Sequence, residues 1–215
     1  MSIVVLMPTR DNPDLAKRAY QTMLDTSESA DMLLCIDDDQ AELYAGLAGR
    51  RMRKNFAPRT DIVGSLNKAV GAFPEYTIYG QMTDDAVFLT PGWDKWVERV
   101  VAEFPARLGV VSPYHNGGKF VNFPYVSREW IQNVGWFACP ETLHFCWDTV
   151  LELLGEATNI RYAEPYEFGL HHYVDRNNKT VPVFLKDCLQ FLGWTVNRRR
   201  DILDKLRAEI ACVKS

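Results

Sequence analysis

The chain has 215 residues, 47% of them hydrophobic and 24% charged, and a formal net charge of −4 at pH 7. This composition is typical of a globular protein with one domain and room for a small appendage, and the net charge gives no overall electrostatic support for nucleic-acid binding. No apolar run approaches the roughly 20 residues that span a bilayer, and the N-terminus enters a strand pattern without a targeting segment. We therefore expect a soluble protein of the cytoplasm without a membrane partner.

Strand and helix patterns alternate through the first part of the chain. Residues 3–7 and 32–36 are short, continuous apolar runs, the pattern of buried parallel strands. Pro13 suits the first position of a helix that has Asp11 or Asn12 as its N-cap. Further helices are predicted at 40–48, from a cap at Thr60 through residue 73 and from Pro91 through residue 101, and further strands at 76–83 and 109–112. This alternating order predicts an α/β fold with a mostly parallel sheet flanked by helices.

The rest of the chain has a less regular pattern. The predicted elements are a strand at 120–126, a short helix capped by Ser127, a helix at 141–154, a strand at 166–173, a turn at 175–179 and a C-terminal helix at 197–213. This change of pattern near residue 115 indicates a smaller second region that follows the alternating part.

Polar clusters follow the first three clear strands, at Thr9-Arg10-Asp11, Asp37-Asp38-Asp39 and Asp84-Asp85. Ligands of such sheets bind beyond the carboxyl ends of the strands, so we expect the clusters on one rim. Two adjacent carboxylates are costly to bury without a partner. Mg²⁺ or Mn²⁺ typically takes one or two protein carboxylates and completes its shell with phosphate oxygens and water. The Asp84-Asp85 pair therefore indicates a metal-held diphosphate, and a solvated turn is the alternative.

Two other groups of residues could have a function. Five basic residues fall within ten positions and form either a solvated face or a patch that attracts phosphate: Arg50, Arg51, Arg53, Lys54 and Arg59. Cys139, His144 and Cys146 could be drawn as a zinc site, but a second close pair of ligands is missing.

The motifs and their order resemble those of GT-A nucleotide-sugar glycosyltransferases, specifically the family 2-like enzymes of bacteriophage type. The likeness spans roughly residues 3–172 and rests on six segments: Met7-Pro8-Thr9-Arg10, Asp37-Asp38-Asp39, Thr83-Asp84-Asp85, Thr90-Pro91-Gly92-Trp93-Asp94, His144 to Asp148, and Glu167 to His172. The chain departs from the family pattern at the metal motif, where Thr83 replaces the first aspartate of Asp-x-Asp.

The resemblance implies a GT-A, Rossmann-like fold with three regions. Residues 1–115 would form the nucleotide-sugar-binding half, 116–180 the acceptor and catalytic half of the same domain, and 181–215 a helical extension. The implied activity is a metal-dependent transfer of a sugar, with inversion, from a nucleoside-diphosphate sugar to an acceptor hydroxyl. Mn²⁺ or Mg²⁺ is the implied metal and a UDP-sugar the favoured donor. The acceptor stays open between hydroxymethylated phage DNA, a protein such as a virion component, and a glycan. A phage enzyme would act in the host cytoplasm.

The resemblance also implies roles for particular residues. Asp85 is the favoured metal ligand, and the family spacing favours His172 over His171 as a second ligand, because alternation along a strand lets one of the two face the site. Asp148, beside Trp147, is the candidate general base, because apolar surroundings raise the pKa of a carboxyl group; a charge on an exposed helix face is the alternative. The residues expected to bind the donor are Pro8, Thr9, Arg10, Asp38, Asp39 and Asp84.

Two other functions remain open at this point. A nucleotidyltransferase would share the alternating topology and an acidic metal site, but the loop Pro8-Thr9-Arg10-Asp11 lacks the glycines of a phosphate-binding loop. A non-catalytic nucleotide-sugar-binding protein would not need a base at Asp148.

Overall fold

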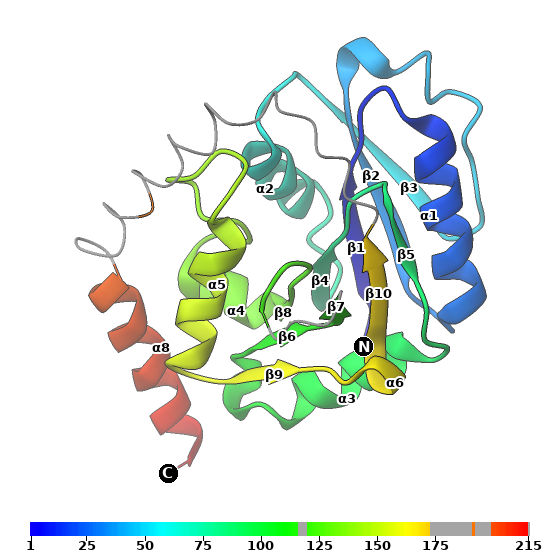
Figure 1. Cartoon of the computed structure of the whole chain (residues 1–215). Coiled ribbons are helices and arrows are strands. Elements are labelled where there is room, and N and C mark those ends of the chain that lie inside the picture. The colour runs from blue at the N-terminus through cyan, green and yellow to red at the C-terminus, as the bar shows by residue number, and fades with distance from the viewer. Residues whose placement is uncertain (116–119, 173–190, 192–198, 215) are drawn as a thin grey trace.

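The computed structural model describes residues 1–115, 120–172, 191 and 199–214. Its centre is a seven-stranded sheet with the strand order β3-β2-β1-β4-β8-β6-β9, and a second, three-stranded sheet has the order β5-β10-β7. Helices lie on both faces of the large sheet (Figure 1). The predicted α/β class, with a mostly parallel sheet flanked by helices, is confirmed.

The central strand β1 (Ile3–Pro8) pairs in parallel with β2 (Asp31–Asp37) on one side and β4 (Ile78–Gln81) on the other. β3 (Met52–Ala57) continues the parallel part at the sheet edge. The apolar run of β1 is continuous because alternate side chains enter different cores. Val5 and Met7 enter one core and Val4 and Leu6 the other, as expected of a strand buried on both faces.

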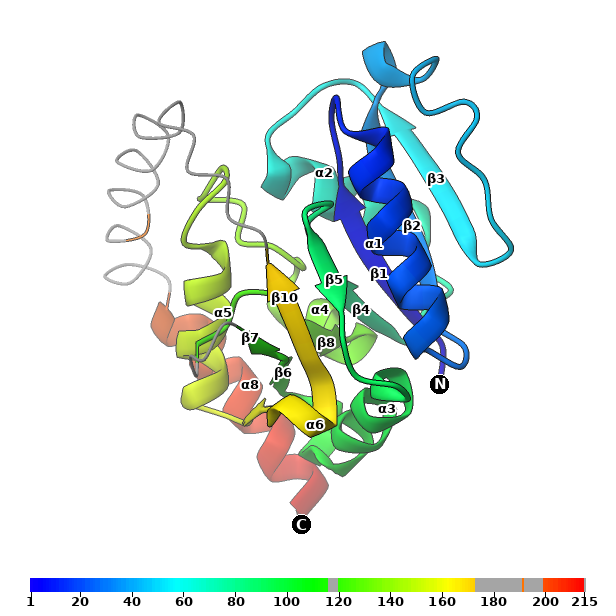
Figure 2. The same cartoon turned by 45° about the vertical axis from the view of Figure 1, so that its right-hand side comes forward.

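The helices divide between the two faces of the large sheet. α1 (Pro13–Thr26) and α3 (Trp93–Glu103) contribute to the core that holds Val5. The opposite core receives four helices: α2 (Ile62–Ala72), α4 (Arg128–Val134), α5 (Trp147–Glu156) and α8 (Arg199–Lys214). Figure 2 shows α1 in front of the sheet and α2, α4 and α5 behind it. The two cores fix the sheet from both sides and so hold its strand ends in place.

The small sheet brings the middle of the chain next to its later part. Its strands are β5 (Ala86–Phe88), β7 (Tyr114–His115) and β10 (Gly169–His172). β10 runs antiparallel to β5, so that His172 lies opposite Ala86. A stack of aromatic rings supports this sheet, since Trp93 lies 4.7 Å from both Phe88 and Phe168 between ring centroids. This packing holds the end of β10 close to the turn that follows β4.

The remaining strands extend the large sheet. β8 (Tyr125–Ser127) lies antiparallel between β4 and β6 (Val110–Ser112), and β9 (Ile160–Tyr162) pairs in parallel with β6. Ser127 caps α4 as predicted, because its side chain accepts a hydrogen bond from the backbone N–H of Trp130. The sheet therefore continues across residue 115, where the sequence pattern changes.

Five predicted elements differ from the structure. Of the strand expected at 120–126, only β8 (Tyr125–Ser127) forms. Residues 40–48 do not form a helix but a short 3₁₀ turn, η1 (Asp38–Gln40), followed by turns. Asp61, and not Thr60, caps α2, because its carboxylate accepts from Gly64 N at 2.7 Å. The helix expected at 141–154 begins only at Trp147. Residues Pro165–Phe168 of the expected strand form the short helix α6, which a reciprocal capping box of Glu164 and Glu167 stabilises.

Four described strands were not predicted, namely β3, β5, β7 and β9, and each lies at the edge of its sheet. One prediction falls outside the described residues. β3 contains Arg53, Lys54 and Asn55, and its side chains are only partly buried, because it is an edge strand with one flank open to solvent. Its pattern therefore lacks the apolar run of β1. The turn expected at 175–179 lies outside the described part of the chain.

Candidate functional site

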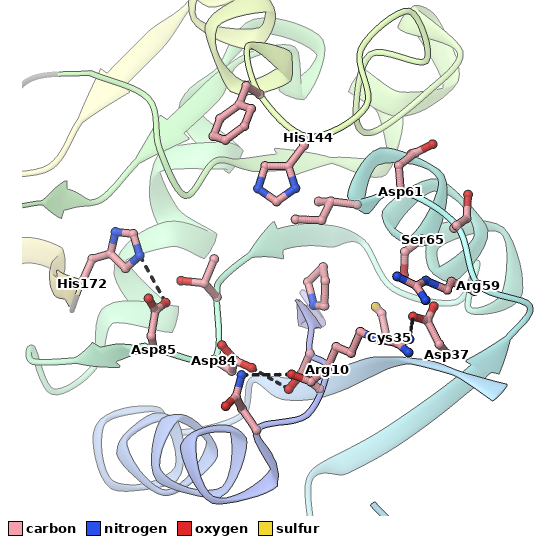
Figure 3. A pocket seen from close by; sticks show the side chains of 17 residues that line it. Arg10, Cys35, Asp37, Arg59, Asp61, Ser65, Asp84, Asp85, His144 and His172 are labelled. Carbon is pink, nitrogen blue, oxygen red and sulfur yellow. Dashed lines mark hydrogen bonds and ion pairs between the residues drawn. The ribbon is translucent and has the colours of Figure 1, made fainter. Parts of the chain in front are cut away.

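A pocket of about 640 Å³ lies at the carboxyl ends of β1, β2 and β4. Figure 3 shows Asp84, Asp85 and His172 along one side, with Arg59, Asp61 and Ser65 opposite and His144 between the two groups. The lining residues are Pro8, Thr9, Arg10, Asn12, Cys35, Asp37, Arg59, Thr60, Asp61, Ile62, Ser65, Thr83, Asp84, Asp85, His144, Phe145 and His172. The expected rim of polar strand ends is therefore present.

Asp84 is held by the end of β1. Thr9 Oγ1 donates a hydrogen bond to Asp84 Oδ2 at 2.7 Å. Burial raises the pKa of Asp84, the Thr9 hydrogen bond lowers it and the neighbouring charge of Asp85 raises it again, so that the net pKa lies above the usual value. Extra positive charge beside Asp84 would therefore be stabilising.

Asp85 has a partner from the small sheet. His172 Nε2 lies 3.1 Å from Asp85 Oδ1. Burial alone would raise the pKa of Asp85, but the interaction with His172 outweighs it, and the pKa lies below its usual value. The pair joins the β4–β5 turn to the end of β10, so the expected carboxylate and the expected histidine do come together.

The acidic pair and His172 fit a divalent ion only as part of a larger shell. Carboxylate oxygens suit Mg²⁺ and Mn²⁺, and a neutral imidazole suits Mn²⁺ better than Mg²⁺. Within residues 1–115, 120–172 and 199–214, no group of three or more His, Cys, Asp or Glu side chains is arranged to hold a metal. This counts equally against the zinc site drawn from Cys139, His144 and Cys146. An ion at Asp85 would need oxygens from a bound ligand.

His115 lies behind His172. Its ring centroid is 5.6 Å from that of His172, and it is 4% exposed. Burial lowers the pKa of His115 to about 4, helped by the two histidines of β10. The neutral, buried ring of His115 thus packs against the ring of His172, which contacts Asp85. His115 does not line the pocket.

Arg10 lines the pocket but is already paired. Its guanidinium donates to Asp37 Oδ2 at 2.6 Å and to both oxygens of Asp39 at 3.0 and 2.7 Å. These hydrogen bonds, with Asp39 first, raise the pKa of Arg10 and lower that of Asp39. Asp37 lines the pocket, whereas Asp38 and Asp39 lie in η1 and do not. The described contacts of Arg10 are therefore with aspartates, and its expected role in binding the donor stays a prediction.

Asp148 lies in the first turn of α5 and not at the middle of a helix. Its side chain is half-buried, and Thr149 N donates to its Oδ1 at 2.8 Å. Burial raises the pKa of Asp148 to about 6. Asp148 is not among the pocket-lining residues, but it follows His144 and Phe145, which are. The structure thus places a carboxyl group with a raised pKa a few residues from the pocket wall.

One wall of the pocket was missed from the sequence. Arg59, Asp61 and Ser65 come from the segment between β3 and α2 and from the first turns of α2. The β3 strand that precedes them carries no apolar pattern, so only the basic cluster and the cap signal pointed to this segment. Cys35 was also missed; burial raises its pKa to about 12, so its thiol is not ionised at neutral pH.

The basic cluster is largely structural. Arg51 Nη2 donates to the carbonyl oxygens of Leu24 and Ser27, and Lys54 Nζ donates to that of Tyr44 at 2.7 Å. Arg59 alone of the five basic residues lines the pocket. These contacts favour neither a fully solvated face nor one continuous phosphate-binding patch.

Comparison with known proteins identifies the type of fold. No family model matches the chain, and no curated protein matches it. The structure is similar to that of the mannosyltransferase PcManGT from Pyrobaculum calidifontis, solved in complex with GDP-Man and Mn²⁺, with a TM-score of 0.58 and 13% sequence identity. The match covers 98% of this chain and 74% of that one. It shows that the fold is of the Rossmann-like, GT-A type.

No helix in the described part of the chain is both long enough and apolar enough to cross a bilayer.

Proposed function

We propose that the chain is a metal-dependent glycosyltransferase that moves a sugar from a nucleoside-diphosphate sugar to an acceptor hydroxyl. The observation that carries this proposal is the position of Asp84, Asp85 and His172 in a pocket at the carboxyl ends of the strands. The fold is shared with a mannosyltransferase that was solved with GDP-Man and Mn²⁺, and this supports the same class of donor here.

Asp85 and His172 would hold the metal, with Asp84 as a second carboxylate or as an acceptor for donor hydroxyls. A bound Mn²⁺ or Mg²⁺ would supply Lewis-acid stabilisation of the charge that develops on the leaving diphosphate. The protein itself contributes two acidic side chains and an imidazole, so the diphosphate oxygens would complete the shell. Metal and donor should therefore bind together.

The opposite side of the pocket would receive the nucleoside. Asp37, Asp61 and Ser65 offer acceptors for ribose hydroxyls or base N–H groups, and Arg59 offers a cation. Pro8 and Thr9 also line the pocket. Arg10, Asp38 and Asp39 would act mainly by fixing the loop after β1, since Arg10 bridges Asp37 and Asp39. UDP- and GDP-sugars are both candidate donors.

Asp148 would be the general base of an inverting transfer. Its pKa of about 6 leaves it ionised at neutral pH yet basic enough to accept a proton from an acceptor hydroxyl. The neighbouring His144 and Phe145 rings would line the path between donor and acceptor. A non-catalytic binding protein would have no need for a carboxyl group with this pKa.

The nucleotidyltransferase alternative is less well supported. A triphosphate-binding loop needs free backbone N–H groups. The loop after β1 has no glycine, and the N–H groups of Thr9, Asp11 and Asn12 already donate to other parts of the protein. The acceptor class stays open between hydroxymethylated DNA of a phage, a protein and a glycan. Arg51 and Lys54, two of the five residues of the basic cluster, contact main-chain carbonyls, which weakens the support of that cluster for DNA binding. A phage origin and a family 2 relationship likewise rest on the sequence motifs alone.

A panel of sugar nucleotides tests the proposal. UDP- and GDP-sugars are incubated with the protein in Mn²⁺, Mg²⁺ or EDTA, and the melting temperature and the released nucleoside diphosphate are measured. We expect at least one donor to raise the melting temperature only with metal, and slow hydrolysis to release its diphosphate. Release of pyrophosphate from nucleoside triphosphates would support the nucleotidyltransferase instead. Metal-dependent binding without any turnover, even with an acceptor library, would support the non-catalytic protein.

A further inference from the structure

A chain of buried hydroxyl groups lies directly beneath the acidic pair. Asn12 N donates to Tyr44 Oη at 3.1 Å, and Tyr44 Oη lies 2.7 Å from Thr9 Oγ1. Thr9 Oγ1 in turn donates to Asp84 Oδ2 at 2.7 Å. The Tyr44 side chain is fully buried and Thr9 is 6% exposed. Three hydrogen bonds therefore connect the start of α1 to Asp84.

The Asp84 end of this series determines the direction of both hydroxyl protons. An ionised carboxylate can only accept, so the single hydroxyl proton of Thr9 goes to Asp84. The hydrogen bond between Thr9 and Tyr44 must then use the proton of Tyr44. A hydroxyl group normally rotates to suit its surroundings, but the Thr9 hydroxyl is held between its acceptor, Asp84, and its donor, Tyr44.

Tyr44 is held in place by contacts outside the pocket. Lys54 Nζ donates to the carbonyl oxygens of Tyr44 and Ala45 at 2.7 and 3.2 Å. The Tyr44 ring belongs to the core formed with α1. Tyr44 does not line the pocket, whereas Thr9 and Asp84 do. Its hydroxyl can thus act on a ligand only through the two pocket residues that it contacts, Thr9 and Asn12.

We propose that Tyr44 is a positioning residue of the donor site. Its hydroxyl orients the Thr9 hydroxyl toward one oxygen of Asp84 and so presents the Asp84 carboxylate in a single orientation to the metal-bound diphosphate. This inference rests on the proposed function, because it assumes that the pocket binds a nucleoside diphosphate with a divalent ion. A tyrosine that only stabilises the fold would have no effect on ligand affinity.

The first test compares two Tyr→Phe variants in the full chain. Tyr44→Phe removes the hydroxyl that joins Asn12 to Thr9. Tyr20→Phe is the matched control, because the Tyr20 hydroxyl is buried without a hydrogen-bond partner in the described residues. Calorimetry with GDP and with UDP, each with Mn²⁺, measures the Kd well below the melting temperature of every variant. One lost hydrogen bond corresponds to an affinity loss of about two- to tenfold. We expect this loss for Tyr44→Phe and none for Tyr20→Phe.

A double-mutant cycle tests whether Tyr44 acts through Thr9. Thr9→Val removes the hydroxyl that Tyr44 orients. We expect Thr9→Val and the double variant to bind with the same Kd, because Tyr44 has nothing left to position. In EDTA, Tyr44→Phe and wild type should bind nucleotide equally weakly. If Tyr44→Phe does not fold, Lys54→Met releases the main chain at Tyr44 and Ala45 and keeps the Tyr44 hydroxyl. Its smaller affinity loss should also vanish beside Thr9→Val.

The outcomes separate this inference from the proposed function. If the wild type binds with Mn²⁺ but Tyr44→Phe binds as tightly, Tyr44 is structural only. If the losses from Tyr44→Phe and Thr9→Val multiply, Tyr44 does not act through Thr9. Either result overturns this inference, and the proposed function stands. If the wild type binds no nucleoside diphosphate in any metal, both fail together.

Discussion

His172 Nε2 lies 3.1 Å from Asp85 Oδ1, and these two residues join the end of β10 to the turn after β4. The contact brings an imidazole from the last described strand to an acidic pair near the middle of the chain. Each of the two side chains on its own would suit many roles. Together, in the pocket that also holds Asp84, they define where a cation would be held.

We expect donor binding to depend on a divalent ion. Asp85→Asn should abolish the Mn²⁺-dependent shift in melting temperature by a nucleoside diphosphate, because the amide oxygen is a weaker ligand and carries no charge. Asp14→Asn on the exposed face of α1 is a charge-matched control and should behave as wild type. Equal nucleotide affinity in Mn²⁺ and in EDTA would contradict the metal site.

Asp148→Asn should separate binding from catalysis. The variant keeps the size of the side chain but cannot accept a proton, so we expect the transfer rate to fall by roughly 10²- to 10⁴-fold while the Kd for the donor changes little. Glu156→Gln, an exposed charge on the same helix, should transfer at the normal rate. A near-normal transfer rate in Asp148→Asn would end the assignment of Asp148 as general base.

The pKa of Asp148 also predicts opposite effects of pH on activity and on stability. Activity should rise as pH increases through about 6, because the base must be ionised. Burial raises this pKa above the unfolded value of about 3.9, so the folded protein binds more protons between these values, and Asp148 contributes less stability as pH rises through that window. Asp148→Asn should remove this dependence and melt no earlier than wild type at pH 8. A variant that melts much earlier at pH 8 would identify Asp148 as a structural ion-pair partner.

Gly80 in β4 should not tolerate a side chain. A Cβ atom there would overlap the ring of Tyr125 on the neighbouring strand β8, and overpacking of a core typically costs about 1–3 kcal/mol. Gly71 in α2 has open space at the same position, so Gly71→Ala should stabilise the helix by about 0.5–1 kcal/mol. Urea denaturation of Gly80→Ala and Gly71→Ala measures the two effects. Similar stability in both variants would contradict the close packing of β4 on β8.

The sequence was sufficient to predict the strands that are buried on both faces of the sheet. It was insufficient to predict the strands at a sheet edge. β1 and β2 were predicted because every side chain of their runs is apolar, and the resulting parallel sheet located the rim of polar strand ends. β3 was missed because its edge position leaves polar residues in the strand. The region at 40–48 was predicted as a helix, although its buried residue Tyr44 is held by hydrogen bonds to distant segments, which no local pattern reveals.

The residues of the candidate site also divide into those that the sequence predicted and those that it did not. Asp84, Asp85 and the loop after β1 follow predicted strands and could be read from the sequence. The wall formed by Arg59, Asp61 and Ser65 could not, because it depends on how α2 packs against the sheet. The pairing of Arg10 with Asp39 also depends on long-range geometry. The roles of Asp148 and His172 stay predictions that the variants above would test.

The position of β8 has a consequence for the synthesis of the protein. β8 lies between β4 and β6 in the sheet but follows both of them in the chain. While a ribosome is still adding the residues up to 127, β4 and β6 are complete but lack the strand that joins them. Each then presents unpaired backbone groups of the kind that promote aggregation. Expression of fragments that stop before residue 125 should therefore yield insoluble material, and the full chain should express best where translation is fast or chaperones are abundant.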